Sequence, residues 1–249
     1  MLTNWADNFI IPSYTTLTNN LVYLEESGNT FASSRNQQNL ENLRNSFINA
    51  YLSWQYVEMF DIGLAEETYY KSKMNIYPTT VSKIELNIQN GNTDFNNSNN
   101  YAAQGFPALD YLLYGIENSD ELILSKFNNE PQYLIYLSNV INQMLQNTYP
   151  IVEDWQNYRN PFIGSVRNTA TSSVNKMTND FIYYYEKGFR ANKFGIPAGV
   201  FSGGALPEKV EAFYNQNISK ALALEGFQAI KNFYNGNGGV SLRQYISEV

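Results

Sequence analysis

Residues 36–62, NQQNLENLRNSFINAYLSWQYVEMFDI, decide the fold class. Apolar side chains recur every three or four residues along this stretch, which is the spacing of one face of an α-helix. The positions that share this face are Leu40, Leu43, Phe47, Tyr51, Trp54 and Glu58. No segment shows the series of alternating apolar and polar residues that half-buried strands produce. The pattern predicts a helix over residues 36–62 and an all-α protein.

Similar periodicity predicts further helices over residues 5–31 (kinked at Pro12), 79–88, 106–114, 131–158, 165–185 and 207–234. The aromatic residues at core positions of these helices are Phe47, Trp54, Phe181 and Phe227. Residues 89–100, QNGNTDFNNSNN, have almost nothing to bury and predict a solvated loop. Residues 188–207 are rich in Gly and Pro but apolar, which fits either a functional loop or a packed crossover.

The helical pattern weakens near residues 122–132, where we place a domain boundary. The prediction is two helical bundles packed side by side. The first covers residues 1–125, and the second covers residues 126–249 with the Gly/Pro-rich crossover.

The composition excludes several kinds of chemistry. The 249 residues include no Cys and no His, so the chain has no disulfide, thiolate nucleophile, Ser-His-Asp triad or usual zinc site. A net charge of −7 provides no basic footprint for nucleic acid.

No apolar run approaches the ~18 residues of a membrane span. The first residues lack the pattern of a secretory leader, so the protein is either cytoplasmic or exported with its leader removed.

Glu58 is the most informative acid, because it follows Trp54 by four residues on the face that otherwise enters the core. An unpaired carboxylate there would have a raised pKa or destabilise the fold, so a cation, a Tyr hydroxyl or backbone N–H groups should meet it. Glu58 is therefore either a core ion pair or a binding or catalytic carboxylate.

Asp110 is the second candidate and lies within the apolar stretch 105–115, GFPALDYLLYG. It follows Pro107 by three residues, so it lies near the start of a short helix, where exposed N–H groups favour an anion. If it converged with Glu58, the two could form a general acid/base pair. They could instead bind a hard cation such as Ca²⁺ or ferric iron.

The Gly/Pro-rich loop contributes two cations and a hydroxyl, Arg190, Lys193 and Ser202. Such a loop can bind a carboxylate or phosphate through these groups and backbone N–H groups. Alternatively, it packs structurally and its cations neutralise Glu58 or Glu211.

These segments resemble the imelysin family of bacterial envelope proteins, historically classed among peptidases and linked with iron-regulated genes. Residues 11–14 and 74–78 resemble its first-helix pattern and its "inlWP" stretch. Residues 54–63 match W-x-x-x-E-x-F-x-x-G, residues 190–197 match R-x-x-K-x-G-I-P, and residues 207–211 match P-x-x-V-E.

The family's hallmark, GxHxxE followed by YLLxG, resembles residues 105–115 with two departures. Gly105 and the YLLxG tail are retained, but Pro107 replaces the His and Asp110 replaces the Glu. A proline side chain is neither a metal ligand nor a base. The resemblance therefore implies the family's scaffold without the residue pair that suggested metal-dependent hydrolysis.

The resemblance implies two bundles that meet at a cleft, where a small ligand or peptide would bind. The residues we expect near that cleft are Glu58, Gly105, Pro107, Asp110, Arg190, Lys193, Ser202 and Glu211. It also implies export to the periplasm or outer membrane, often as a lipoprotein, and an association with iron uptake. Iron or another hard cation is a possible cofactor, and a further segment beyond Val249 is expected.

Three hypotheses follow from these features. The first is a non-catalytic binding protein for a small ligand, a peptide or an iron species. The second is a metal-dependent peptidase or another carboxylate-based hydrolase, and the third is a scaffold or interaction module without a small ligand.

Overall fold

The structure is a computed structural model that describes residues 1–167 and 169–248, without the side chain of Gln216. Within these residues it contains helices and no strand, so the all-α prediction is confirmed. The α-helices are α1 (Leu2–Trp5), α2 (Ile11–Ser33), α3 (Gln37–Trp54), α4 (Leu64–Glu67), α5 (Tyr70–Met74), α6 (Val81–Asn90), α7 (Gly105–Tyr114), α8 (Asp120–Asn129), α9 (Pro131–Gly164), α10 (Ser173–Tyr183), α11 (Gln216–Asn235) and α12 (Leu242–Glu248). Segments of π-helix are η1 (Ala6–Ile10) and η3 (Tyr184–Gly195), and segments of 3₁₀-helix are η2 (Ser98–Ala103), η4 (Pro207–Lys209) and η5 (Gly236–Gly238).

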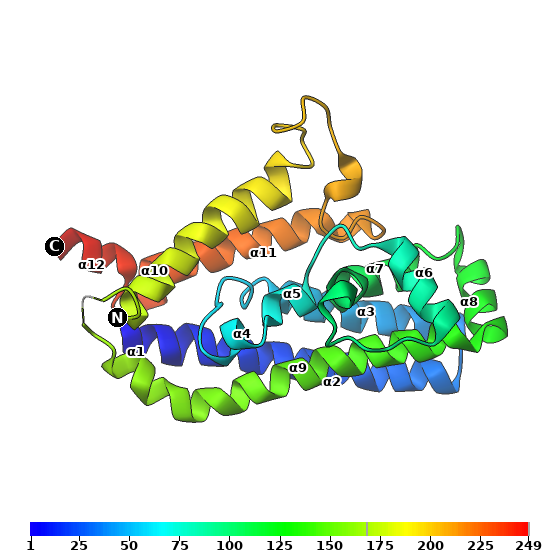
Figure 1. The fold of residues 1–249 in the computed structure, drawn as a ribbon, viewed down its shortest axis with the longest axis horizontal. Helices are drawn as coiled ribbons and strands as arrows, with labels where there is room; N and C mark the ends of the chain where they lie inside the picture. The colour runs from blue at the N-terminus through cyan, green and yellow to red at the C-terminus, as the bar shows by residue number, and fades with distance from the viewer. Residues whose placement is uncertain (168, 249) are drawn as a thin grey trace.

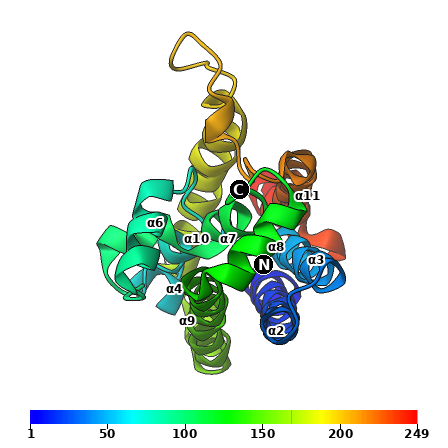
Figure 2. The same cartoon turned by 90° about the vertical axis from the view of Figure 1, so that its right-hand side faces the viewer.

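The base of the molecule is a layer of long helices in which α2 packs against both α3 and α9 (Figures 1 and 2). The apolar faces of these helices meet in the core, where Leu17, Leu21, Leu43, Phe47 and Val140 are fully buried. α3 begins at residue 37 because the side chain of Asn36 accepts a hydrogen bond from the Asn39 N–H.

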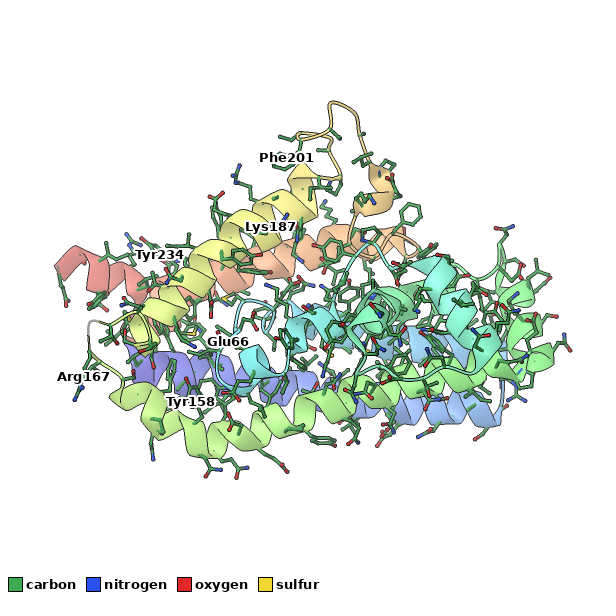
Figure 3. All side chains as sticks on the ribbon, in the orientation of Figure 1. Glu66, Tyr158, Arg167, Lys187, Phe201 and Tyr234 are labelled. Atoms are coloured by element: carbon green, nitrogen blue, oxygen red, sulfur yellow. The ribbon has the colours of Figure 1, made fainter. Side chains whose placement is uncertain are left out.

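α10 and α11 lie on the other side of the fold from α9, and α10 rises at an angle while α11 runs roughly along the base (Figure 1). α10 continues directly into η3, and both η3 and α3 contact α11 (Figure 1). The segment after η3 forms the apex of the molecule, where Phe201 projects from the loop (Figure 3). α9 packs along α2 although the sequence assigned it to the second bundle, and the division at residue 125 stays a prediction.

The helix predicted over residues 36–62 ends at Trp54, so the prediction is wrong for residues 55–62. The N–H groups of Val57 and Glu58 both donate to the Trp54 carbonyl, and the chain then continues in turns. Residues 57–60 are all buried. Four consecutive residues cannot share one face of a helix, so their burial requires an irregular backbone.

Other expectations also need correction. The α-helices predicted over residues 165–185 and 207–234 begin only at Ser173 and Gln216. Residues 188–195 belong to the π-helix η3, so the Gly/Pro-rich connection starts only at Ile196. Residues 89–100 are not wholly solvated, because Phe95 and Asn100 are buried. Phe47 and Trp54 are buried as predicted, but Phe227 is 45% exposed and lines an open apolar groove between η3 and α11.

The position of α7 is fixed by a close approach to α5. Gly105 has a φ of 73°, and a Cβ there would lie 2.2 Å from the Met74 carbonyl oxygen. Only glycine tolerates both the positive φ and this contact. As a result, Pro107 and Asp110 lie beside the segment that follows α5, where the pocket described below is formed.

Candidate functional site

A buried ammonium group lies between two carboxylates in the interior. Lys193 Nζ is 2.5 Å from Glu211 Oε2 and 3.3 Å from Glu58 Oε2. All three side chains are at most 4% exposed. Lys193 comes from η3, Glu58 from the turns after α3, and Glu211 from the segment before α11. The ion triad therefore joins three parts of the chain that are distant in sequence.

Neutral amides complete this network. Asn75 Nδ2 donates to Glu58 Oε1 at 3.0 Å and to Glu211 Oε1 at 2.8 Å. Gln55 accepts from Lys193 Nζ at 2.7 Å and donates to Glu211 Oε1 at 3.1 Å. The Tyr51 hydroxyl donates to Asn75 Oδ1 at 2.8 Å, which fixes the orientation of that amide. The buried Glu58 therefore has a partner at each oxygen: Asn75 donates to Oε1, and the Lys193 ammonium pairs with Oε2.

The network keeps its charges. Burial raises the pKa of Glu58, but the charges of Lys193 and Lys71 outweigh burial and leave that pKa below its usual value. Burial likewise lowers the pKa of Lys193, yet Glu211 and Glu58 raise it overall. At neutral pH Glu58 and Lys193 are therefore charged, and the amide donors of Gln55 and Asn75 supplement the ammonium at the two carboxyl groups.

Asp110 anchors the segment that carries Glu211. Its Oδ2 accepts from the Tyr214 N–H at 2.8 Å, and its Oδ1 accepts from the Asn215 N–H at 2.9 Å. Between these anchors and Glu211 lies Ala212, which has a φ of 56°. A positive φ strains a non-glycine residue and persists only where the surroundings enforce it. Here the ion triad holds the chain on one side and Asp110 on the other, and the Ser219 hydroxyl donates to the carbonyls of Glu211 and Ala212.

Burial raises the pKa of Asp110 to about 6, although the N–H groups of Tyr214 and Asn215 act to lower it. This carboxyl therefore titrates close to neutral pH. In a chain without His, no side chain with an unperturbed pKa titrates in this range.

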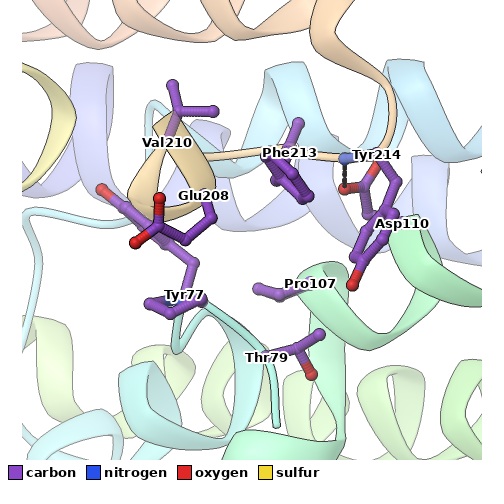
Figure 4. Close-up of a pocket in the computed structure, with 10 residues that line it drawn as sticks. Tyr77, Thr79, Pro107, Asp110, Glu208, Val210, Phe213 and Tyr214 are labelled. Atoms are coloured by element: carbon purple, nitrogen blue, oxygen red, sulfur yellow. Dashed lines mark hydrogen bonds between the residues drawn. The ribbon is translucent and has the colours of Figure 1, made fainter. Parts of the chain in front are cut away.

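A pocket of about 190 Å³ opens between these segments (Figure 4). Its walls come from the start of α7, from the residues after α5 and from the segment before α11. The lining residues are Tyr77, Pro78, Thr79, Pro107, Asp110, Glu208, Val210, Ala212, Phe213 and Tyr214. Tyr77 also connects the pocket to the network, because its ring centroid lies 5.9 Å from Lys193 Nζ.

The sequence-predicted site residues separate into four groups. Glu58, Lys193 and Glu211 meet in the buried triad, whereas Pro107 and Asp110 line the pocket. Gly105 lies at the start of α7, where it contacts the end of α5.

Arg190 and Ser202 lie apart from both the triad and the pocket. The guanidinium of Arg190 is bound to Glu186 on the surface of η3. The Ser202 hydroxyl donates to the Gly204 carbonyl within an exposed loop. A binding role for either residue stays a prediction.

Sequence reasoning missed the amides and most of the pocket wall. Asn and Gln are abundant in this chain, so nothing in the sequence distinguishes Gln55 and Asn75 from the others. Tyr77 and Glu208 did lie in segments that resemble the family, and this was the only available signal.

The donor set does not fit a resident iron ion. In the described part of the chain, no three Asp, Glu, His or Cys side chains gather at a distance suited to a metal. A hard cation needs several oxygen ligands, and the Lys193 ammonium already occupies the space between the two buried carboxylates. The cation that pairs with both buried carboxylates is thus the Lys193 side chain.

The fold and the site define an all-helical protein with a small pocket above a buried ion network. The family model for imelysin, Peptidase_M75, matches residues 10–249, so this chain belongs to the imelysin family. This confirms the resemblance noted in the sequence. No curated protein gives a significant match.

Two solved structures share the fold. One is described as an iron-regulated protein A precursor from Parabacteroides distasonis, with 16% identity and a TM-score of 0.75, covering 94% of this chain and 72% of that one. The other is an imelysin-like protein from Psychrobacter arcticum, with 16% identity and a TM-score of 0.74, covering 99% of this chain and 78% of that one. Among residues 1–167 and 169–248, no helix has both the length and the apolarity to cross a membrane.

Replacing Lys193 with Met should destabilise the protein strongly. The change leaves two carboxylates buried without their cation, and we expect the free energy of unfolding to fall by about 3–5 kcal/mol. Urea unfolding followed by circular dichroism measures this. The control is Lys187→Met at an exposed position of the same helix (Figure 3), which should change stability by less than about 0.5 kcal/mol. Equal effects of the two changes would contradict the role given to the triad.

Replacing Asp110 with Asn should remove a pH dependence of stability. Because folding raises the pKa of Asp110 from 3.8 to about 6, the contribution of this carboxyl is greatest below about pH 4 and is lost as the pH rises through about 6. The unfolding free energy of the wild type minus that of the variant should fall by about 2–3 kcal/mol between these limits. Parallel stability curves from pH 4 to pH 7 would show that Asp110 does not titrate in this range.

Proposed function

We propose that this imelysin-family chain is a non-catalytic binding protein that holds a small ligand in the pocket between α7, residues 77–79 and residues 208–214. The observation that carries the proposal is the strained wall of the pocket. Ala212 is kept at a positive φ by the ion triad and by Asp110. Backbone strain of this kind clusters at binding and active sites, where the surrounding structure over-determines the conformation.

The chemistry of the walls supports binding more than catalysis. Pro107 lines the pocket at the position where the family's hallmark has a His, and its ring cannot transfer a proton. Glu58 is held by Lys193 and Asn75 and does not line the pocket. The predicted pair of Glu58 and Asp110 therefore lacks a shared position in which both could meet one substrate.

One observation favours a second candidate, a hydrolase that uses Asp110. A carboxyl with a pKa of about 6 at a pocket wall suits a general acid. However, each of its oxygens already accepts a backbone N–H, which gives Asp110 a structural role.

Filling the pocket should abolish binding. Thr79→Trp places an indole in the cavity, while the control Thr79→Val keeps the size but also loses the hydrogen bond from Thr79 Oγ1 to the Ala102 carbonyl. In a ligand-observed NMR screen of small amines, alcohols, amides and carboxylic acids, the compounds that bind the wild type should bind Thr79→Val equally. They should lose at least about tenfold in affinity for Thr79→Trp, since the cavity is their only contact area.

Two results would contradict this proposal. One is a screen in which no compound binds, or in which binding is unaffected by Thr79→Trp. The other is cleavage of unfolded polypeptides by the wild type that disappears in Asp110→Asn, which would establish the hydrolase instead.

We further propose that the protein is exported to the periplasm or outer membrane and serves iron uptake. The support is family membership together with the description of one structural neighbour as an iron-regulated protein precursor. In cells grown with an iron chelator, the amount of the protein should rise, and fractionation should recover it from the envelope. A cytoplasmic protein whose level ignores iron would contradict both parts.

A further inference from the structure

The pocket has an unbalanced charge. Of its ten lining residues, two are acids, Asp110 and Glu208, and none is Lys or Arg. The nearby cation Lys193 is committed to Glu211 and Glu58. Figure 4 shows the carboxyl groups of Asp110 and Glu208 on two sides of the cavity. The net charge of −7 also gives the whole chain a general attraction for cations.

Asp110 retains the capacity to bind a ligand. Each of its oxygens accepts one N–H from the backbone, from Tyr214 and from Asn215. A carboxylate offers about four lone-pair sites, so two remain for a donor in the cavity. Glu208 is exposed and has no hydrogen-bond or ion-pair partner among the described residues, so its carboxylate can turn toward a bound group.

Aromatic rings form much of the remaining wall. Tyr77, Phe213 and Tyr214 all line the cavity, and the rings of Phe213 and Tyr214 pack edge to face with centroids 5.1 Å apart. The faces of aromatic rings attract cations, and such cages recognise organic ammonium groups. Prolines 78 and 107 add apolar surface suited to an alkyl chain.

The volume of the pocket restricts what it holds. About 190 Å³ is smaller than the roughly 300–1,000 Å³ of sites that bury a drug-sized ligand. The pocket therefore accepts a group of the size of one amino-acid side chain.

We propose that the pocket binds a small organic cation, an alkylammonium or alkylguanidinium group, between the carboxylates of Asp110 and Glu208 and the rings of Tyr77, Phe213 and Tyr214. The group is either a free amine or the side chain of Lys or Arg in a peptide. This inference rests on the proposed binding function and specifies the chemistry of its ligand.

Calorimetry with n-butylammonium, n-butylguanidinium, n-butanol and butyrate tests the inference. The two cations should bind the wild type at least about tenfold more tightly than the neutral alcohol of equal size, and butyrate should not bind. Glu208→Gln should weaken binding of the cations about tenfold and leave the alcohol unchanged, because Glu208 is exposed and its loss does not affect folding. Glu153→Gln, an exposed acid on α9 outside the pocket, is the matched control and should behave as the wild type.

The source of the cation is identified by a second comparison. N-acetyl-lysine-N-methylamide should bind more tightly than n-butylammonium if the natural ligand is a peptide side chain, and less tightly if it is a free amine. Either order supports a cation site.

Equal binding of n-butanol and n-butylammonium, or equal effects of Glu208→Gln and Glu153→Gln, would overturn the cation inference. If neutral or anionic compounds bind and Thr79→Trp blocks them, the binding function stands and only the ligand class is wrong. If none of these four compounds binds the wild type, the cation inference fails, and the broader NMR screen decides separately whether the binding function stands.

Discussion

The buried ammonium of Lys193 is the interaction on which the site depends. Burying Glu58 and Glu211 without a cation would be strongly unfavourable, so the turns after α3, the π-helix η3 and the segment before α11 must come together at one point. The contact between Gln55 and Glu211 alone spans 156 residues of sequence. Asn75, which follows α5, closes the network by binding both carboxylates. The core helices can pack by apolar contact, but the relative position of these four segments is set by charge.

The pocket follows from that constraint. Glu211 is fixed by Lys193, and three residues later the backbone is fixed again by Asp110. The intervening Ala212 takes a positive φ, so a rigid wall faces the start of α7. Gly105 lets α7 approach α5 closely enough to supply the opposite wall. A pocket with walls fixed in this way binds a ligand without the entropic cost of ordering loops.

The sequence predicted those features that depend on local pattern. The spacing of apolar residues and the turn residues indicated the all-α class and the short buried helix at residues 105–114. The position of Glu58 on a core-facing side of a helix indicated that its carboxylate needs a partner. The sequence offered Arg190 and Lys193 as counter-ions for Glu58 or Glu211 but could not decide between them, because ion pairing carries no periodic signal. The structure shows that the partner is Lys193, 135 residues from Glu58. The sequence also misplaced the end of α3 and the start of the connection after η3. In both places the ion network around Lys193 outweighs the local sequence preference. The chain forms turns at residues 55–59 instead of a helix, and a π-helix that includes Lys193 instead of a loop.

The absence of His has a physical consequence in this structure. In a chain with no imidazole, titration near neutral pH passes to buried carboxyls. Burial raises the pKa of Asp110 to about 6, and burial together with the charges of Asp61 and Glu66 raises the pKa of Asp180 to about 7. Protonation of Asp110 would remove a negative charge from the pocket and weaken its attraction for a cation, and it can occur at a lone-pair site that accepts no backbone N–H. Cation binding in this pocket is therefore coupled to pH through the carboxyl group that takes the place of the Glu in GxHxxE.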